Sequence, residues 1–455
     1  MISITLVIIS IIIFLKLSKF YQFTILSLTV FLPFTFGDFR SIPSLLFVEW
    51  LTVVTFLMLV NELVPLHSIE KRIKIIKFKG IELFIFAILI LITWTIVSFI
   101  NYEILYQPIK NIENKTGTNR LYFNIFNNIL LFFTVIIFSV VYHDKLDFER
   151  FFKVLYTISI FIGLTAILAY IWEFNIPLIE GTFGYNTAYN KVLAAKYGGQ
   201  AYRLGGMAEI VTLGLPALFA HYIIKKKISL FALILLLFFA FMSGGRTLVI
   251  GVIFAITFFS FVFLPRNFIY LISALALFVI LGAIFLPQSV LIGQFGRLTS
   301  LDSGNFMGQD VSRGLAWKFY LENFSKNPIW GKGIIEYQGY IYSSAEGSGE
   351  FAKEQLFAGG HGSYLSILST FGLGGITYFL IIVFGGIYLS FRKIKQHINL
   401  DLNKTAIAVF CFMLITIKSV DFITGGNGLS DATILFFTVG LVASLTVLQN
   451  RKDFV

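Results

Sequence analysis

Long apolar runs alternate with short polar connections along almost the whole chain. The runs cover residues 2–15, 23–36, 42–60, 81–100, 121–141, 152–172, 204–224, 228–242, 247–264, 268–286, 363–389, 405–417 and 432–448. A helix needs about 20 residues to cross a bilayer, so the shorter runs are expected to recruit flanking residues whose Lys or Tyr tips reach the interface. The pattern predicts an all-α, polytopic membrane protein with 12–13 transmembrane helices, the lower number applying if the first run does not span.

The composition agrees with a protein dissolved in lipid. Hydrophobic residues make up 57% of the 455 residues and charged residues only 13%, against about 25% charged residues in soluble domains. The net charge of +11 comes from small clusters of Lys and Arg between the apolar runs, a pattern that favours membrane topology over nucleic-acid binding. The single cysteine, Cys411, excludes an intrachain disulfide and a Cys-based zinc site. The N-terminus lacks a cleavage signature and is expected to stay as an anchor.

Basic residues fall in alternate connections, as the positive-inside rule requires. One set holds 20 of the 35 basic residues: Lys16, Lys19, Lys71, Arg72, Lys74, Lys77, Lys79, Lys145, Arg150, Lys153, Lys225, Lys226, Lys227, Arg266, Arg392, Lys393, Lys395, Lys404, Arg451 and Lys452. This set is predicted to be cytoplasmic, which places the C-terminus inside the cell and, with thirteen spans, the N-terminus outside.

One external connection is long enough to form a lid. It divides the chain into N-terminal transmembrane helices (1–286, about ten), a large periplasmic loop (287–362) and C-terminal transmembrane helices (363–455, about three). Connections of this length in a compact protein are usually functional or disordered. Within it, residues 310–324 carry an apolar stripe at four-residue spacing, which predicts a short helix closed by Asn327 and Pro328.

The sequence lacks the usual soluble-enzyme motifs. It contains no phosphate-binding loop with Lys and Ser/Thr, no dinucleotide fingerprint and no pair of His residues at metal-binding spacing. Nucleotide hydrolysis is therefore not expected, and a substrate delivered by the membrane, such as a lipid-linked molecule, is the better hypothesis.

Five short motifs, taken in order, carry a family resemblance. Ser243-Gly-Gly-Arg-Thr-Leu248 lies upstream of Arg313-Gly-Leu-Ala-Trp317. Asn327-Pro-Ile-Trp-Gly-Lys-Gly333 follows, and then His361-Gly-Ser-Tyr-Leu365 with Phe371-Gly-Leu-Gly-Gly375. This series resembles the superfamily of O-antigen ligases and Wzy-type O-antigen polymerases. The resemblance covers residues 203–389, less than half of the chain.

The resemblance implies a GT-C-like membrane enzyme without cofactor or metal, a metal-independent glycosyltransferase of the bacterial inner membrane. Its substrate would be glycan linked to undecaprenyl pyrophosphate, its active site would face the periplasm, and a chain-length regulator protein would be a further partner. Polymerases of this kind carry Arg-x10-Gly in two external loops, and Arg203 to Gly214 and Arg297 to Gly308 fit that spacing. The favoured function is polymerisation of repeat units, and the alternative is ligation of the glycan to lipid A core.

The chemistry indicates which residues would act. Arginine binds phosphate oxygens bidentately and stays charged near lipid, so Arg203, Arg246 and Arg313 are the candidates for holding the pyrophosphate. A neutral imidazole can accept the proton of an acceptor hydroxyl, and His361 is the only histidine predicted to lie outside. Glu209, at the start of an apolar run, completes the set together with Arg297, which the polymerase spacing adds.

Each assignment has a structural alternative. External arginines can simply anchor helix ends at the lipid headgroups, and His361 can be an ordinary loop residue. Arg313 could pair with Asp310, Glu209 with Arg203, and Lys418 with Asp421, as neutralising pairs. A function of another class, a flippase for lipid-linked oligosaccharide, would predict two matching halves with broken helices, which the sequence does not display.

Overall fold

The structure is a computed structural model of the chain, and helices are the only regular elements in the part it describes. That part comprises residues 2–32, 47–63, 80–100, 118–172, 207–243, 245–263, 288, 311–333, 362–423 and 432–452. The predicted span 268–286 lies outside it, as does most of the predicted periplasmic loop.

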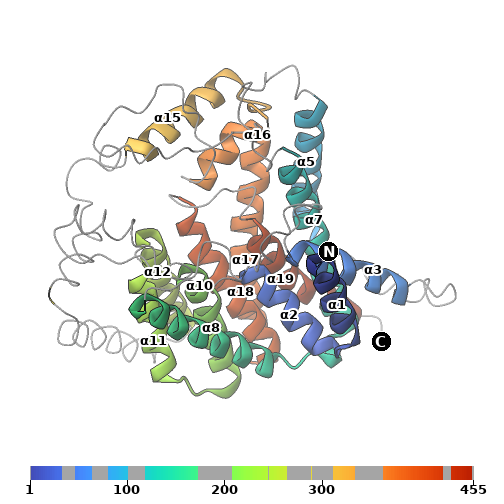
Figure 1. The fold of residues 1–455 in the computed structure, drawn as a ribbon, viewed down its shortest axis with the longest axis vertical. Helices are drawn as coiled ribbons and strands as arrows, with labels where there is room; N and C mark the ends of the chain where they lie inside the picture. The colour runs from blue at the N-terminus through green and yellow to red at the C-terminus, as the bar shows by residue number, and fades with distance from the viewer. Residues whose placement is uncertain are drawn as a thin grey trace.

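Twelve of the thirteen predicted apolar runs fall in the described part of the chain, wholly or in part, and their described residues are mainly helical (Figure 1). The helices are α1 (Ile2–Lys16), α2 (Lys19–Phe31), α3 (Phe47–Leu63), α5 (Glu82–Ile100), α7 (Thr118–Val141), η2 (His143–Lys145), α8 (Phe148–Ile171), α10 (Met207–Lys225), α11 (Leu230–Met242), α12 (Arg246–Phe263), α15 (Val311–Lys326), α16 (Ser363–Leu380), η4 (Ile381–Gly385), α17 (Gly386–His397), α18 (Leu402–Asp421) and α19 (Thr433–Lys452). Among the described residues, six helical segments are long and apolar enough to cross a membrane. The predicted all-α polytopic fold is thereby confirmed.

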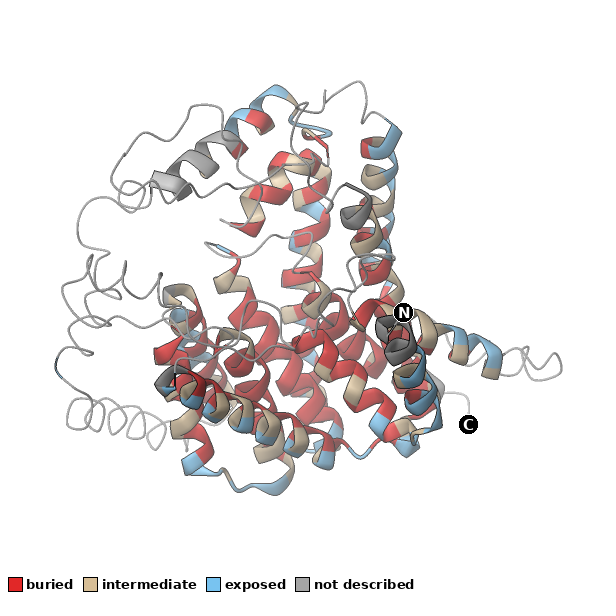
Figure 2. Cartoon of the chain, in the orientation of Figure 1, coloured by how far each residue is buried: buried red, intermediate tan, exposed pale blue. Residues whose placement is uncertain are grey.

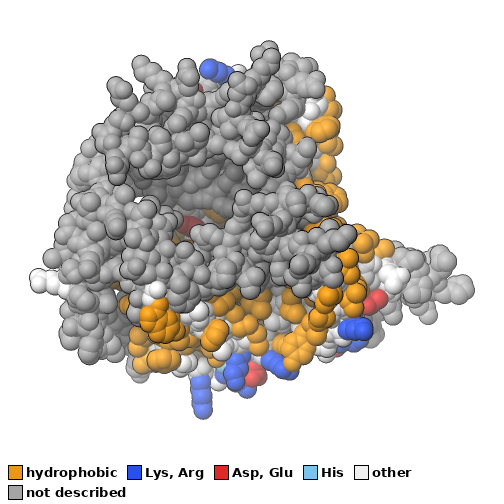
Figure 3. Space-filling view, viewed as in Figure 1, with side chains coloured by type: hydrophobic (Ala, Val, Ile, Leu, Met, Phe, Trp, Pro, Cys, Tyr) orange, Lys and Arg blue, Asp and Glu red, His pale blue; other side chains and the backbone are white. Residues whose placement is uncertain are grey.

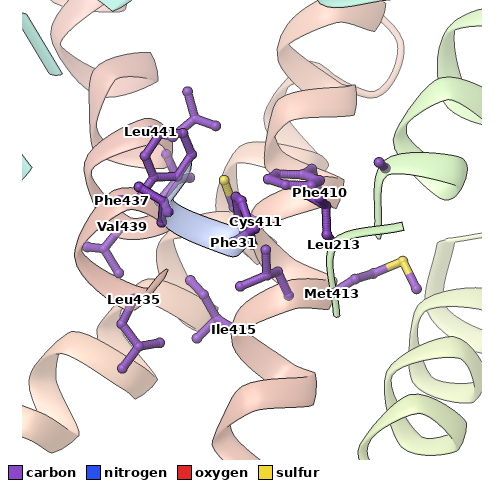
Figure 4. Close-up of a cluster of buried hydrophobic side chains, with 14 of the residues drawn as sticks. Phe31, Leu213, Phe410, Cys411, Met413, Ile415, Leu435, Phe437, Val439 and Leu441 are labelled. Atoms are coloured by element: carbon purple, nitrogen blue, oxygen red, sulfur yellow. The ribbon is translucent and has the colours of Figure 1, made fainter. Parts of the chain in front are cut away.

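Helix α18 lies at the centre of the bundle. It packs against α10, α12, α17 and α19, and 83% of its most apolar 18-residue window is buried, compared with 28% for the peripheral α5 (Figure 2). Figure 4 shows side chains of α10, α18 and α19 meeting Phe31 of α2 around the buried Cys411. Because lipid is as apolar as these side chains, close packing rather than exclusion from water holds such helices together.

Helix ends that carry basic residues meet on one face of the bundle. Lys225 at the end of α10 pairs with Glu149 of α8 at 2.8 Å, and Arg150 of α8 donates to the Tyr21 hydroxyl of α2 at 2.7 Å. Lys19 of α2 pairs with Glu62 of α3 at 2.6 Å. Figure 3 shows Lys and Arg side chains along the lower edge, below a belt of hydrophobic side chains. The helix ends at Lys19, Arg150 and Lys225, three of the basic positions that the charge pattern groups together, therefore lie on the same face.

The predicted span 363–389 is not one straight helix, which corrects the sequence interpretation. Gly372 has φ 59° and ψ −147°, a conformation open to glycine but not to other residues. The ring centroids of Tyr364 and Phe379 are 5.3 Å apart, whereas 15 residues of a straight helix would separate them by about 22 Å. Residues 363–371, here called the arm, thus fold back on the helix that starts after Gly372.

A turn after α15 caps this break, and residues 327–333 are called the capping turn. A broken helix exposes backbone groups that need partners, above all close to lipid. The amides of Lys332 and Gly333 donate to the carbonyls of Ser369 (2.8 Å) and Thr370 (2.7 Å), and the Leu373 amide donates to Pro328 O at 2.8 Å. The capping turn therefore supplies the partners that the reversal at Gly372 removes.

Helix α15 confirms the helix predicted within the lid. It runs beside the arm, with Leu365 of the arm and Trp317 packed against the buried Tyr320, and the Asn323 amide donates to Ser369 Oγ at 3.3 Å. On the other side of the capping turn, Trp94 of α5 donates from Nε1 to Ile329 O at 3.1 Å. The lid helix is thus fixed to two membrane-spanning helices.

The variant Gly372→Ala should test this arrangement. A Cβ atom at position 372 would lie 2.5 Å from the carbonyl oxygens of Pro328 and Ile329, and alanine disfavours the backbone conformation by about 1–3 kcal/mol. We expect a clearly lower melting temperature of the purified protein, followed by tryptophan fluorescence. Gly245→Ala is the control, because its nearest neighbour would lie 3.4 Å away. Equal melting temperatures for Gly372→Ala and the wild type would contradict the capped break.

Candidate functional site

The end of α18 opposite its basic start joins the beginning of α12. Asp421, the last residue of α18, accepts a hydrogen bond at Oδ1 from the Thr247 hydroxyl at 3.2 Å. Its Oδ2 lies 3.4 Å from the ammonium of Lys418. Further along, a Cβ at Gly251 would lie 2.9 Å from Ile417 O, so α12 and α18 are in backbone contact. Residue 246 therefore lies directly beside the end of α18.

The same end of α18 holds the start of the arm. Phe422 O, one residue after Asp421, accepts the amide hydrogen of Ser363 at 2.9 Å, and Ser419 O accepts from the Tyr364 hydroxyl at 3.1 Å. Phe422 is buried and packs on Phe379 at a centroid distance of 5.6 Å. The backbone next to His361 is therefore fixed to the backbone next to Asp421.

The lid helix approaches the start of the arm at Gly362. This glycine has φ 107°, and a Cβ there would lie 3.0 Å from Ile423 O and 3.2 Å from Trp317 Nε1. Arg313 is one helical turn before Trp317 on α15, so its backbone lies on the same side of that helix. The start of α12, the lid helix, the start of the arm and the end of α18 thus meet in a junction of four segments, called the junction below, formed by residues 247, 317, 362, 363, 421 and 422.

The turn between α11 and α12 has its own local explanation. Ser243 is buried, donates to Ala240 O at 2.6 Å and accepts the Gly245 amide at 3.2 Å. The Val249 amide donates to Gly245 O at 3.0 Å, so the carbonyl of Gly245 accepts the first hydrogen bond of α12. Arg246 is the first residue of that helix. The Ser-Gly-Gly-Arg motif therefore positions the α12 N-terminus.

The structure describes the predicted site residues to different extents. It gives the backbone of Arg246 in the first turn of α12 and that of Arg313 near the start of α15. His361, Arg203 and Arg297 lie outside the described residues, and His361 directly precedes Gly362. In the sequence, three of the candidates lie within four residues of a junction residue: Arg246, Arg313 and His361. The catalytic or binding roles of these three, and of Arg203 and Arg297, stay predictions.

Glu209 and the absence of a metal also stay predictions. Glu209 is half-buried in the first turn of α10, and among the described residues its carboxylate makes no recorded hydrogen bond or ion pair. In the described part of the chain no three His, Cys, Asp or Glu side chains gather where a metal ion could bind.

The sequence predicted only a charged pair at the end of α18, whereas the structure also connects this end to α12. The pairing of Lys418 with Asp421 is confirmed at 3.4 Å, but the hydrogen bond from Thr247 joins positions 174 residues apart and has no signal in the sequence. The spacing of a charged pair at the end of an apolar run was the available clue. The link from that pair to α12 arises from the packing of helices that are far apart in the sequence.

Basic side chains also lie at the far end of the lid helix. Partial burial, and then the neighbouring charge of Lys326, lower the pKa of Lys332. Both residues belong to the segment that ends α15 and forms the capping turn.

These features define a class: an all-α polytopic membrane protein in which the helix α15 is attached to a broken transmembrane helix, next to the C-terminal end of a central buried span. Residues 231–380 match the family model described as O-antigen ligase. The match runs from α11 to the end of α16 and confirms the resemblance to the O-antigen ligase and polymerase superfamily that the motifs indicated. No curated protein matches the chain.

Gly362→Ala should loosen the junction. Because φ 107° is unfavourable for alanine and Ile423 O and Trp317 Nε1 leave little space, the arm must shift and its hydrogen bond to Phe422 must weaken. We expect amide exchange in peptides covering the start of the arm to become about tenfold faster, equivalent to about 1.4 kcal/mol. Peptides of α19 serve as the internal control, and unchanged exchange in the arm would contradict this description of Gly362.

Proposed function

We propose that the chain is a glycosyltransferase that polymerises undecaprenyl-pyrophosphate-linked oligosaccharide repeat units into O-antigen or a related surface polysaccharide. The observation that carries the proposal is the junction: four segments of the family region or its flank meet where the sequence supplies two arginines and a histidine. The reaction needs cations for a pyrophosphate and a base for a hydroxyl, and these residue types provide both.

The backbone at the junction favours an anionic ligand. Helices α12 and α16 both begin there, at Arg246 and Ser363, and the N-terminal end of a helix carries partial positive charge, while the Ser363 amide itself is bound to Phe422 O. Arg246 and Arg313 would add full positive charges, because a guanidinium group stays protonated at physiological pH even near lipid. Arg203 would be a third cation and Arg297 and Glu209 further contacts in this proposal.

The proposed step forms one bond and breaks one. The terminal hydroxyl of a fresh repeat unit attacks the anomeric carbon of the growing chain, and the bond from that carbon to the pyrophosphate oxygen breaks. His361 accepts the proton of the attacking hydroxyl, and undecaprenyl pyrophosphate leaves with the electron pair, stabilised by the arginines. Attack opposite to the leaving group would invert the anomeric centre.

The distribution of charge supports a periplasmic site. The paired basic helix ends gather on one face, and α18 carries Lys404 in its first turn and reaches the junction at its other end, Asp421. If the basic face is cytoplasmic, as the positive-inside rule states, the junction faces the periplasm of the inner membrane. A substrate flipped to that side would reach it from the lipid.

A ligase is the second candidate, because the matching family model is described by that activity. A ligase would use the same donor and the same proton transfer and would differ only in the acceptor, lipid A core in place of a repeat unit. The sequence spacing of Arg203 and Arg297 to glycine favours the polymerase.

Deletion of the gene in its own host separates the candidates. Loss of a polymerase should leave single repeat units on the carrier and on lipid A core, whereas loss of a ligase should leave long lipid-linked chains and bare core. Gel ladders of lipopolysaccharide and mass spectrometry of lipid-linked glycans measure both. Repeat units retained on the cytoplasmic side would contradict both enzymes and indicate a flippase.

His361→Ala should lower the polymerisation rate by about 100-fold or more, the usual contribution of a general base. Arg246→Ala and Arg313→Ala should each cost a similar factor through weaker stabilisation of the leaving pyrophosphate. The matched controls are His221→Ala in the body of α10 and Arg392→Ala on α17, both far along the chain from the junction segments. The assay restores each variant to the deletion strain at equal membrane abundance, and full chain elongation with His361→Ala would exclude it as the base.

A further inference from the structure

Asp421 connects the two helix starts of the junction. One carboxylate oxygen accepts from Thr247 at 3.2 Å, the other pairs with Lys418 at 3.4 Å, and the following residue, Phe422, holds the Ser363 amide. A segment of two residues therefore sets where α12 and the arm begin relative to each other.

The position of Asp421 is unfavourable for α18 itself. The C-terminal end of a helix carries partial negative charge, so a carboxylate in the last position destabilises that helix, an effect that the positive charge of Lys418 in the same turn offsets. The carboxylate faces the N-terminal turn of α12 instead, where the partial charge is positive. The charge of Asp421 is thus explained by its contact with α12 rather than by the stability of α18.

The bond to Thr247 is well placed to orient residue 246. Thr247 immediately follows Arg246 in the first turn of α12, and α12 touches α18 again at Gly251 and Ile417. Two contacts one turn apart fix the depth and the rotation of a helix start. A hydrogen bond to an ionised acceptor is also stronger than one between neutral groups.

The geometry points to Asp421 as a positioning residue of the glycosyl transfer site, acting through Thr247 on Arg246, with Lys418 paired to the other carboxylate oxygen. The inference rests on the proposed function, because its effect is expected on the transfer reaction. Asp421 itself touches no reacting atom in this account. Lys418 and Thr247 would be needed for the same reason.

The test uses purified full-length protein in lipid nanodiscs, with lipid-linked repeat units extracted from the deletion strain as the donor and acceptor. Thr247→Val and Asp421→Ala should each lower the rate about tenfold, the effect of losing one charged hydrogen bond. The double variant should be no slower than the slower single variant, because both remove the same interaction. Thr247→Ser should retain most of the rate because the hydroxyl remains, whereas Asp421→Asn should give a rate between those of the wild type and Asp421→Ala, because the acceptor oxygen remains but the charge does not.

The control is Thr134→Val in α7, whose hydroxyl donates to Leu130 O of its own helix at 2.7 Å and whose rate should equal the wild-type rate. Multiplying effects in the double variant, or losses that follow a lower melting temperature, would mean a general structural role and overturn the inference. A wild-type rate for Thr247→Val, while Arg246→Ala is inactive, would overturn it and leave the proposed function standing. An inactive wild-type protein, or an active Arg246→Ala, would instead defeat the proposed function.

Discussion

The reversal of the chain at Gly372 is the constraint on which the arrangement of the site depends. A break in a helix close to the membrane leaves backbone amide and carbonyl groups without hydrogen-bond partners, and lipid cannot supply these partners. Such breaks persist only where other parts of the protein form the missing hydrogen bonds. Here the capping turn does so, and Gly331 and Gly372 are so close that a side chain on either would collide with the backbone of the other segment. The glycines of both family motifs are thus explained by one contact between the lid and the bundle.

The contact between the capping turn and the break determines how the arm and α15 are placed relative to the end of α18. Because the arm folds back from Gly372, its start at Gly362 lies level with the end of α18 instead of projecting beyond it. Helix α15 follows the arm in parallel, with Trp317 beside Gly362 and Asn323 beside Ser369, and so brings the segment that contains Arg313 toward the same level. A lid fixed in this way can bring groups to a phosphate at the membrane surface without a soluble domain.

Hydropathy predicted much of the fold, because lipid makes every spanning segment a continuous apolar run. The helix in the lid was also predictable, since the stripe from Val311 to Phe319 and the stop at Asn327 are local signals. The break inside 363–389 was not, because hydropathy records no direction and Gly372 differs little in sequence from the glycines around it. For the site, residue chemistry suggested Arg246, Arg313 and His361, but the connection through Thr247 and Asp421 arises only when distant helices pack.

The central claim is that the junction, on the face opposite the basic helix ends, binds the pyrophosphate of a prenyl-linked glycan. An electron cryo-microscopy structure of the protein in nanodiscs with undecaprenyl pyrophosphate measures this most directly. The account predicts phosphate density in contact with the guanidinium groups of Arg246 and Arg313, with the His361 imidazole beside the terminal phosphate. Phosphate density at the basic face, or at the outer face but away from these three side chains, would contradict it.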